Sequence, residues 1–164
     1  MLPSSHIFLG AITSFFIFII FPQIGWLAFL IIFLSSVLID FDHYLYYVVK
    51  KKDFSLMNAY AWFIKNRDIW MALSKKEKEK FQQGIIIFHG IECWILLILL
   101  TLISRWFLFV LIGVLVHMVF DFIELYKNNS PFYIKFSQVY THRKNKRLKL
   151  ENEGVRVKKR VKPA

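Results

Sequence analysis

The sequence predicts an all-α integral membrane protein: a four-helix bundle with a cytoplasmic helical loop and a basic C-terminal tail. Its composition, its long uncharged segments and the uneven placement of its basic residues support this prediction. Of 164 residues, 57% are hydrophobic and 18% are aromatic, and the mean hydropathy is +0.47. A soluble domain of this size would be less apolar.

The first apolar segment covers residues 7–39 and contains no Asp, Glu, Lys or Arg. About 20 helical residues cross a bilayer core of about 30 Å, so this segment is too long for one crossing. Near its middle, Pro22-Gln23-Ile24-Gly25 predicts a turn, because proline and glycine together break a helix. We therefore expect one helix from about His6 to Phe21 and a second from about Trp26 to Tyr47.

The second half of the chain repeats this plan. A third helix is expected from about Phe81 to Ile103, followed by a polar turn at Ser104-Arg105 and a fourth helix from Trp106 to about Tyr126. Ser74 and Glu77 form a capping-box pattern, which predicts a charged helix over residues 75–80 that continues directly into the third helix.

The basic residues predict the orientation of the chain in the membrane. The net charge is +11, and all Lys and Arg except Arg105 lie between the second and third helices or after the fourth. By the positive-inside tendency, both termini and the central loop, about residues 48–80, face the cytoplasm. We therefore divide the chain into a membrane domain, residues 1–126, and a cytoplasmic basic tail, residues 127–164.

Residue types that commonly bind metal recur near the predicted cytoplasmic ends of all four helices. A charged side chain at the centre of a membrane helix costs about 2.5–3.5 kcal/mol, so several of them together suggest a shared role. His117 and Asp121 are four residues apart and His89 and Glu92 are three apart, so each pair shares one helix face. Inward-facing pairs of this kind build metal sites in helical bundles. The predicted ligands are His6, Asp40, Asp42, His43, His89, Glu92, His117 and Asp121.

Carboxylate and imidazole ligands favour a divalent metal, with zinc as the leading choice and one to three ions as the expected number. Of Asp40 and Asp42, one could bind metal while the other bridges ions or holds a water molecule. Glu92 fits either a ligand or a general base. Asp42 and Glu92 are therefore the candidate catalytic residues.

Four parts of the sequence follow one another in a fixed order: His6 before Gly10, Leu38-Ile39-Asp40-Phe41-Asp42-His43, Phe88-His89, and Gly113-Val114-Leu115-Val116-His117-Met118-Val119-Phe120-Asp121. This pattern resembles membrane-bound, metal-dependent hydrolases of the YdjM type. The resemblance covers about residues 1–126. It implies a predicted hydrolase, remotely similar to the helical zinc-dependent phospholipase C fold. It also implies seven of the metal ligands named above, all except Glu92. Many members of that family have His-Arg-Gly-x-Thr-His where this chain has His89-Gly90-Ile91-Glu92, so Glu92 takes the place of a second histidine.

A site flanked by basic residues at the membrane surface suits a phosphoester or another anionic group on an amphiphilic substrate. One alternative is a non-catalytic bundle with a structural metal or a polar clamp, whose basic tail binds lipid or a partner. A second alternative, an ion or proton carrier, is disfavoured because the outer halves of the helices offer few polar groups.

Two further segments have predicted surface roles. Residues 54–73 read as an amphipathic helix, which could lie on the membrane or pack as a short cytoplasmic helix. From Arg143 to Lys162 there are ten basic residues against Glu151 and Glu153, which predicts a disordered tail that binds anionic lipid headgroups. Nucleic acid is a less favoured partner because residues 143–162 contain no aromatic residue for base stacking.

Overall fold

The structure, a computed structural model, describes the backbone of residues 3–161 and the side chains of residues 4–149. Within this range the chain is helical and has no β-strand, which confirms the all-α class. In chain order the elements are α1 (Pro3–Ile20), the 3-10 turn η1 (Pro22–Ile24), α2 (Gly25–Leu38), α3 (Phe41–Lys51), α4 (Leu56–Ala72), α5 (Lys75–Lys80), α6 (Ile91–Thr101), α7 (Trp106–Lys127), α8 (Tyr133–Phe136) and α9 (Gln138–Val161).

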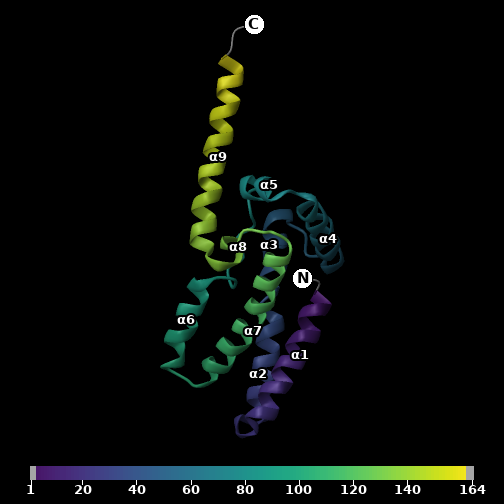
Figure 1. Ribbon diagram of the computed structural model, residues 1–164, viewed down its shortest axis with the longest axis vertical. Helices are drawn as coiled ribbons and strands as arrows, with labels where there is room; N and C mark the ends of the chain where they lie inside the picture. The colour runs from purple at the N-terminus through teal and green to yellow at the C-terminus, as the bar shows by residue number, and fades with distance from the viewer. Residues whose placement is uncertain (1–2, 162–164) are drawn as a thin grey trace.

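Four apolar helices form one half of the molecule, and the turns that join them in pairs lie together at its end (Figure 1). Helices α2 and α7 pack along each other, α1 packs against both, and α6 packs against α7. The predicted first turn is confirmed: Pro22 begins η1, and Gly25 has a φ of 78°, in the left-handed region that glycine adopts without strain. The N-terminus and helices α3, α4, α5 and α8 lie at the opposite end (Figure 1).

Small residues allow α1, α2 and α7 to approach closely. A Cβ atom on Gly113 would collide with the carbonyl oxygen of Ile32 and lie 2.8 Å from Cβ of Ser35. A Cβ atom on Gly10 would lie 2.5 Å from Oγ of Ser36. Such small-residue contacts are typical of packed membrane helices. They bring the polar ends of these three helices together.

Two segments are long and apolar enough to cross a membrane, by length and composition: Pro22–Lys51, with 30 residues, and Trp106–Lys127, with 22. Helix α1 and helix α6 are apolar but shorter. Only 22% and 33% of the most apolar windows of the two long segments are buried. Much of their apolar surface is therefore exposed, as expected for contact with lipid rather than for the core of a soluble protein.

The second predicted helix, Trp26 to Tyr47, is interrupted at Ile39–Asp40. The backbone amides of Asp40 and Asp42 donate to carbonyl oxygens three residues earlier, each at an N–O distance of 3.4 Å. In an α-helix the acceptor would lie four residues earlier. The chain then continues as α3 as far as Lys51. Asp40 thus lies in a bend between two helices, and not inside one continuous helix as predicted.

The third apolar helix begins at Ile91 and not near Phe81 as predicted, because residues 81–90 are not helical. Backbone amides in this segment donate to side chains of distant elements. Ile86 N donates to Oε1 of Gln138 (3.0 Å) and Phe88 N donates to Oδ2 of Asp42 (2.9 Å). Gly90, with a φ of 152°, then leads into α6. The segment 81–90 therefore forms tertiary hydrogen bonds in place of intrahelical ones, and its residue His89 is buried in the interior.

Helices α4 and α5 are present between α3 and residue 81, but α4 is not amphipathic as predicted, because its apolar residues are spread around the helix and most of them are exposed. The side chain of Ser55 caps α4 by accepting a hydrogen bond from Asn58 N. Ser74 and Glu77 form the predicted capping box at the start of α5. Helix α5 ends at Lys80, so it does not continue into the third apolar helix as expected. Helix α4 packs on α3, with the ring of Trp62 5.7 Å from that of Tyr47.

The chain after α7 folds back onto the bundle before it extends away. Helix α8 contacts α7, and the first turns of α9 contact α6. Gln138 and Thr141 are buried there, and Leu148 is buried further along. The disorder expected from Arg143 is not observed, because the described backbone is helical as far as Val161 and projects from the molecule (Figure 1). Lys162 lies outside the described residues.

Candidate metal centre

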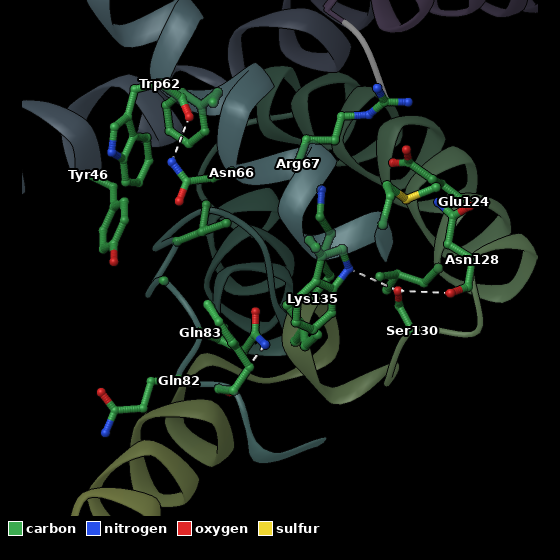
Figure 2. A pocket seen from close by; sticks show the side chains of 18 of the residues that line it. Tyr46, Trp62, Asn66, Arg67, Gln82, Gln83, Glu124, Asn128, Ser130 and Lys135 are labelled. Atoms are coloured by element: carbon green, nitrogen blue, oxygen red, sulfur yellow. Dashed lines mark hydrogen bonds between the residues drawn. The ribbon is translucent and has the colours of Figure 1, made fainter. Parts of the chain in front are cut away.

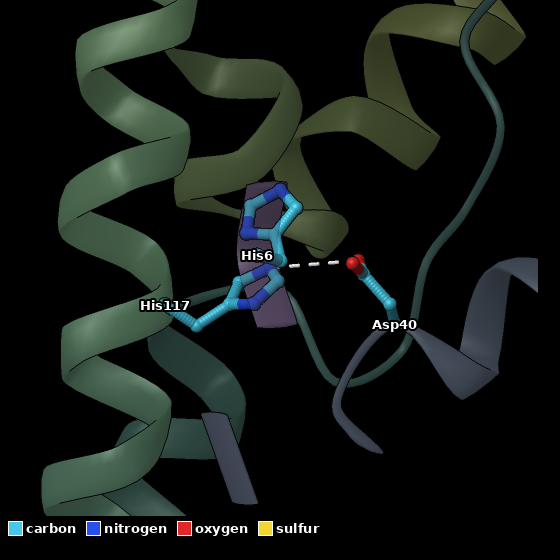
Figure 3. Close-up of side chains that lie close together, drawn as sticks. All are labelled: His6, Asp40 and His117. Carbon is cyan, nitrogen blue, oxygen red and sulfur yellow. Dashed lines mark ion pairs between the residues drawn. The ribbon is translucent and has the colours of Figure 1, made fainter. Parts of the chain in front are cut away.

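Six of the eight predicted ligands converge from separate elements into three overlapping groups whose ligand atoms lie within 4.8 Å of one another. Helix α1 contributes His6, the bend after α2 contributes Asp40, and segment 81–90 contributes His89. Figure 3 shows His6 and His117 meeting Asp40 across the gap between α1, α7 and the bend. The three groups are His6, Asp40 and His117; Asp40, His43 and His89; and His89, His117 and Asp121.

The centre of this cluster consists of two imidazole nitrogens and two carboxylate oxygens that face one another. Nε2 of His89 and Nε2 of His117 are 3.2 Å apart. Oδ2 of Asp121 lies 3.2 Å from the His117 nitrogen and 3.4 Å from the His89 nitrogen. Oδ1 of Asp40 lies 3.4 Å from each of these nitrogens. His89, His117 and Asp121 are fully buried, so water does not separate these groups.

Hydrogen bonds on the far side of each ring fix which nitrogen faces the centre. Nδ1 of His117 lies 2.8 Å from the carbonyl oxygen of Ser36, which can only accept, so this nitrogen carries the proton. Nδ1 of His89 lies 3.0 Å from Oδ2 of Asp42, with the same consequence. In the neutral rings, both Nε2 atoms therefore present lone pairs to the centre. An acceptor behind each ring is the usual arrangement for metal-binding histidines.

The cluster holds more negative than positive charge. Asp40, Asp42 and Asp121 contribute three carboxylates, and the ammonium of Lys135, 2.5 Å from Oδ2 of Asp121, contributes one positive charge. With neutral histidines, a formal charge of −2 remains, which equals the charge of one divalent ion. Oδ1 of Asp121 and Nδ1 of His6 are buried without a hydrogen-bond partner among the described residues. The donor set and the charge therefore fit a divalent metal ion.

Protons can neutralise part of the negative charge of the cluster when no metal is bound. Burial and Lys135 lower the pKa of His89, but the hydrogen bonds to Asp121, Asp40 and Asp42 outweigh them and raise it to about 10. Burial also lowers the pKa of the Lys135 ammonium, and the carboxylates of Asp121 and Asp40 more than restore it, so its pKa is raised. A metal ion that binds here would therefore compete with a proton for His89.

One side of the cluster is open. The side chains of His43 and Asp40 are 25% and 27% exposed, whereas those of His6 and Asp121 are 3% and 0% exposed. His6 stacks on His117, with ring centroids 4.2 Å apart, and closes the opposite side. A small molecule could therefore approach a bound ion only past Asp40 and His43.

Asp42 belongs to none of the three groups of candidate ligands and lies behind two of their histidines. Its Oδ1 lies 3.0 Å from Nδ1 of His43, and its Oδ2 accepts from Nδ1 of His89 and from Phe88 N. Both oxygens are thus used to orient other groups. The side chain is buried, and the geometry supports a role in holding His43 and His89 in position.

Glu92 points away from the cluster and binds the start of α9. Its Oε1 accepts hydrogen bonds from Oγ of Ser137 (2.6 Å) and from Val139 N (3.1 Å), and its Oε2 accepts from Gln138 N (3.2 Å). A carboxylate at a helix N-terminus is stabilising because it satisfies free backbone amides. Glu92 therefore belongs to none of the three ligand groups.

Lys135 is the main residue of the site that sequence reasoning missed. It was assigned to the basic tail with the other cations after residue 126. A distinguishing signal was present, because Lys135 is a single basic residue in the apolar run Tyr133-Ile134-Lys135-Phe136. The carbonyl oxygen of Ser36 was also missed, since a backbone acceptor leaves no trace in the sequence.

Comparisons of this chain with protein-family models, with curated proteins and with solved structures find no match.

Proposed function

We propose that this protein is a membrane-bound, metal-dependent hydrolase whose metal centre faces the cytoplasmic surface of the membrane. The observation that carries the proposal is the buried cluster of His89, His117 and Asp121, in which ring tautomers and charge are matched to a divalent ion. The order of the ligand blocks, which resembles hydrolases of the YdjM type, supports the same function.

The geometry supports the following assignment of ligands. His89, His117 and Asp121 would hold a zinc or similar ion, with Asp40, His43 and His6 as further ligands, alone or at a second ion. A divalent ion bound here would supply a Lewis acid and would lower the pKa of a water molecule to about 7. Asp42 keeps His43 and His89 oriented. Asp40 and His43, the exposed members, border the path by which a substrate would enter.

The membrane placement is part of the proposal. The exposed apolar surface of α2 and α7 supports burial in lipid, and α1 and α6 would complete a four-helix membrane bundle. The ligand cluster would then lie at the cytoplasmic interface, beside the basic segments. Anionic headgroups at that surface would attract the basic side chains of α9, and an amphiphilic phosphoester would meet the site from the same surface.

A non-catalytic bundle with a structural metal or a polar clamp is the second candidate, because Lys135 already supplies one positive charge to the Asp121 carboxylate. A structural site is typically closed by four protein ligands, whereas a catalytic site keeps an open position. The exposure of Asp40 and His43 favours the catalytic alternative.

Elemental analysis of the detergent-purified protein tests the proposal. We expect about one or more divalent ions per chain in the wild type, and loss of bound metal in a variant that combines His117→Ala with Asp121→Ala. His142→Ala, an exposed histidine on α9, is the matched control and should keep the metal. A wild type that never binds metal stoichiometrically would rule out the metal-dependent hydrolase.

Helical content measured by circular dichroism shows whether the double variant still folds. His89→Gln is a milder second variant, because the amide preserves polarity but removes the imidazole ligand. Metal-loaded wild type should hydrolyse a panel of phosphomonoesters and phosphodiesters, and both ligand variants should lose this activity. Metal binding without hydrolysis of any ester would favour the structural role.

A further inference from the structure

A cavity of about 280 Å³, with apolar walls and several polar and charged side chains, lies beside the candidate metal centre, between α3, α4, the segment 81–86 and the α7–α8 region. Figure 2 shows its lining side chains around a central space, with Trp62 and Asn66 on one side and Ser130 and Asn128 on the other. The function proposed above assigns no role to this cavity.

The cavity is lined by hydrogen-bond donors and basic groups. Lys50, Arg67 and Lys135 contribute positive charge, and amide side chains contribute further donors. Glu124 is the one carboxylate among these lining residues. Nε of Arg67 is buried and has no hydrogen-bond partner in the described part of the chain. A buried donor without a partner costs free energy, which an anionic ligand with several acceptor oxygens would recover.

Lys135 connects the cavity to the metal centre. It lines the cavity, and its ammonium donates to Oδ2 of Asp121 at 2.5 Å. An ammonium has three N–H donors, and Asp121 is the one hydrogen-bond partner of Lys135 within the described residues, so two donors remain for a ligand.

A shared neighbour, Phe63, connects the cavity to the partly exposed side of the candidate metal centre. Phe63 lines the cavity, and its ring contacts that of His43, with centroids 5.6 Å apart. His43 is one of the two partly exposed residues of the cluster. Asp40 and His43 are not among the described lining residues, so a ligand in the cavity would reach the cluster through the Lys135 ammonium, which contacts Asp121.

We infer that this cavity binds the phosphate group of the substrate and that Lys135 is its principal contact. Carboxylates bind equally to lysine, but several cations and amide donors around one space suit the several oxygens of phosphate. Cleavage of a phosphoester there rests on the proposed function, whereas phosphate binding does not. The phosphate could belong to a lipid headgroup or to a water-soluble ester.

Phosphorus NMR titration of the purified full-length protein, with chelator and then with zinc, measures this binding without requiring catalysis. The probes are inorganic phosphate and dihexanoyl phosphatidic acid. Lys135→Met removes the charge and keeps an unbranched side chain of nearly the same length, and Lys135→Arg keeps the positive charge. Lys65→Met, an exposed lysine on α4 outside the cavity, is the matched control.

We expect the wild type to bind phosphate even with chelator. Lys135→Met, compared with the wild type in the presence of zinc, should weaken binding by about tenfold or more, because a charged hydrogen bond is lost. Lys135→Arg and Lys65→Met should stay close to the wild type. Lys50→Met, on the α3 wall of the cavity, should also weaken binding, and it supplies a second test if Lys135→Met unfolds.

Failure of the chelated wild type to bind phosphate, or equal binding by the wild type, Lys135→Met and Lys50→Met, would overturn the inference whatever the metal content. Phosphate binding of the expected pattern by a protein that takes up no zinc would support the inference and reject the metal-dependent hydrolase. Tighter binding of dihexanoyl phosphatidic acid than of inorganic phosphate would identify a lipid headgroup as the source. Equal binding of the two would identify a water-soluble ester.

Discussion

Asp42 and Glu92 were paired as catalytic candidates by their residue type, yet their surroundings in the folded chain differ. Asp42 contacts two histidines of the cluster through its two oxygens. Glu92 contacts two backbone amides and a hydroxyl at the start of α9. These two carboxylates can therefore be separated by substitution.

Asp42→Asn should lower the affinity for zinc by about 10- to 100-fold, because an outer carboxylate fixes the orientation and tautomer of the ligating imidazoles. The amide group of asparagine would present N–H donors to at least one ring nitrogen that now donates. Competition with a chromophoric chelator measures the affinity. Asp68→Asn, at an exposed carboxylate of α4, should leave it unchanged. Complete loss of zinc from Asp42→Asn would instead make Asp42 a direct ligand, as its sequence position suggested.

Glu92→Ala should keep the full metal content but lower the free energy of unfolding by about 1–2 kcal/mol, because α9 loses the side chain that caps it. Thermal unfolding in detergent together with elemental analysis measures both effects. Glu92→Gln retains one acceptor oxygen and should cost less stability than Glu92→Ala. Loss of metal from either variant would contradict the capping role and restore Glu92 as a ligand.

At the scale of helices, the contact between α2 and α7 sets the geometry of the cluster. Gly113 lies one turn before His117, at a point where any side chain would strike the α2 backbone. The carbonyl oxygen of Ile32 cannot move away as a flexible side chain could. The separation of these two helices is therefore fixed by a single residue.

Gly113→Ala should destabilise the protein by about 1–3 kcal/mol, as expected for overpacking of a tight contact. It should also lower the metal affinity, since Nδ1 of His117 is held by the carbonyl oxygen of Ser36 on α2. Leu115→Ala, at an exposed position of α7, should stay within about 0.5 kcal/mol of the wild type. Thermal unfolding and zinc titration are the measurements. Equal stability of Gly113→Ala and the wild type would show that the two helices can separate at little cost.

The helices that the sequence predicted well are those whose limits depend on local chemistry. Helix α7 begins at Trp106 as predicted, after the polar turn, and α5 begins at the capping box of Ser74. The start of the third apolar helix was wrong because Asp42 and Gln138 bind the backbone of segment 81–90 from distant parts of the chain. No local pattern carries such tertiary hydrogen bonds.

The same distinction applies to the candidate site. The spacing of His117 and Asp121, together with the expected topology, was enough to predict that ligand residues of several helices would meet. The bend at Asp40 and the return of α8, which brings Lys135 to Asp121, depend on packing between elements. The periodicity of a sequence indicates which residues share a face of one helix. It does not indicate which helices pack against one another.

At the scale of the whole molecule, the two ends of the bundle should lie on opposite sides of the membrane. In a Cys93→Ser background, Arg105→Cys in the turn before α7 should react with a membrane-impermeant maleimide on intact cells. Lys76→Cys, an exposed position on α5, should react only after permeabilisation. Labelling of both positions from the outside, or of neither, would contradict the proposed orientation.

Lys135 also bears on the order of events when the protein matures. A domain that folds around its metal stays unfolded until the ion arrives. Here the chain supplies its own ammonium to the buried Asp121 carboxylate, so the helices can assemble first and take up the ion afterwards. Circular dichroism after chelation should accordingly show nearly unchanged helix content, while Lys135→Met should lose helix on chelation. With this internal cation, biogenesis of the protein does not have to wait for the cell's metal supply.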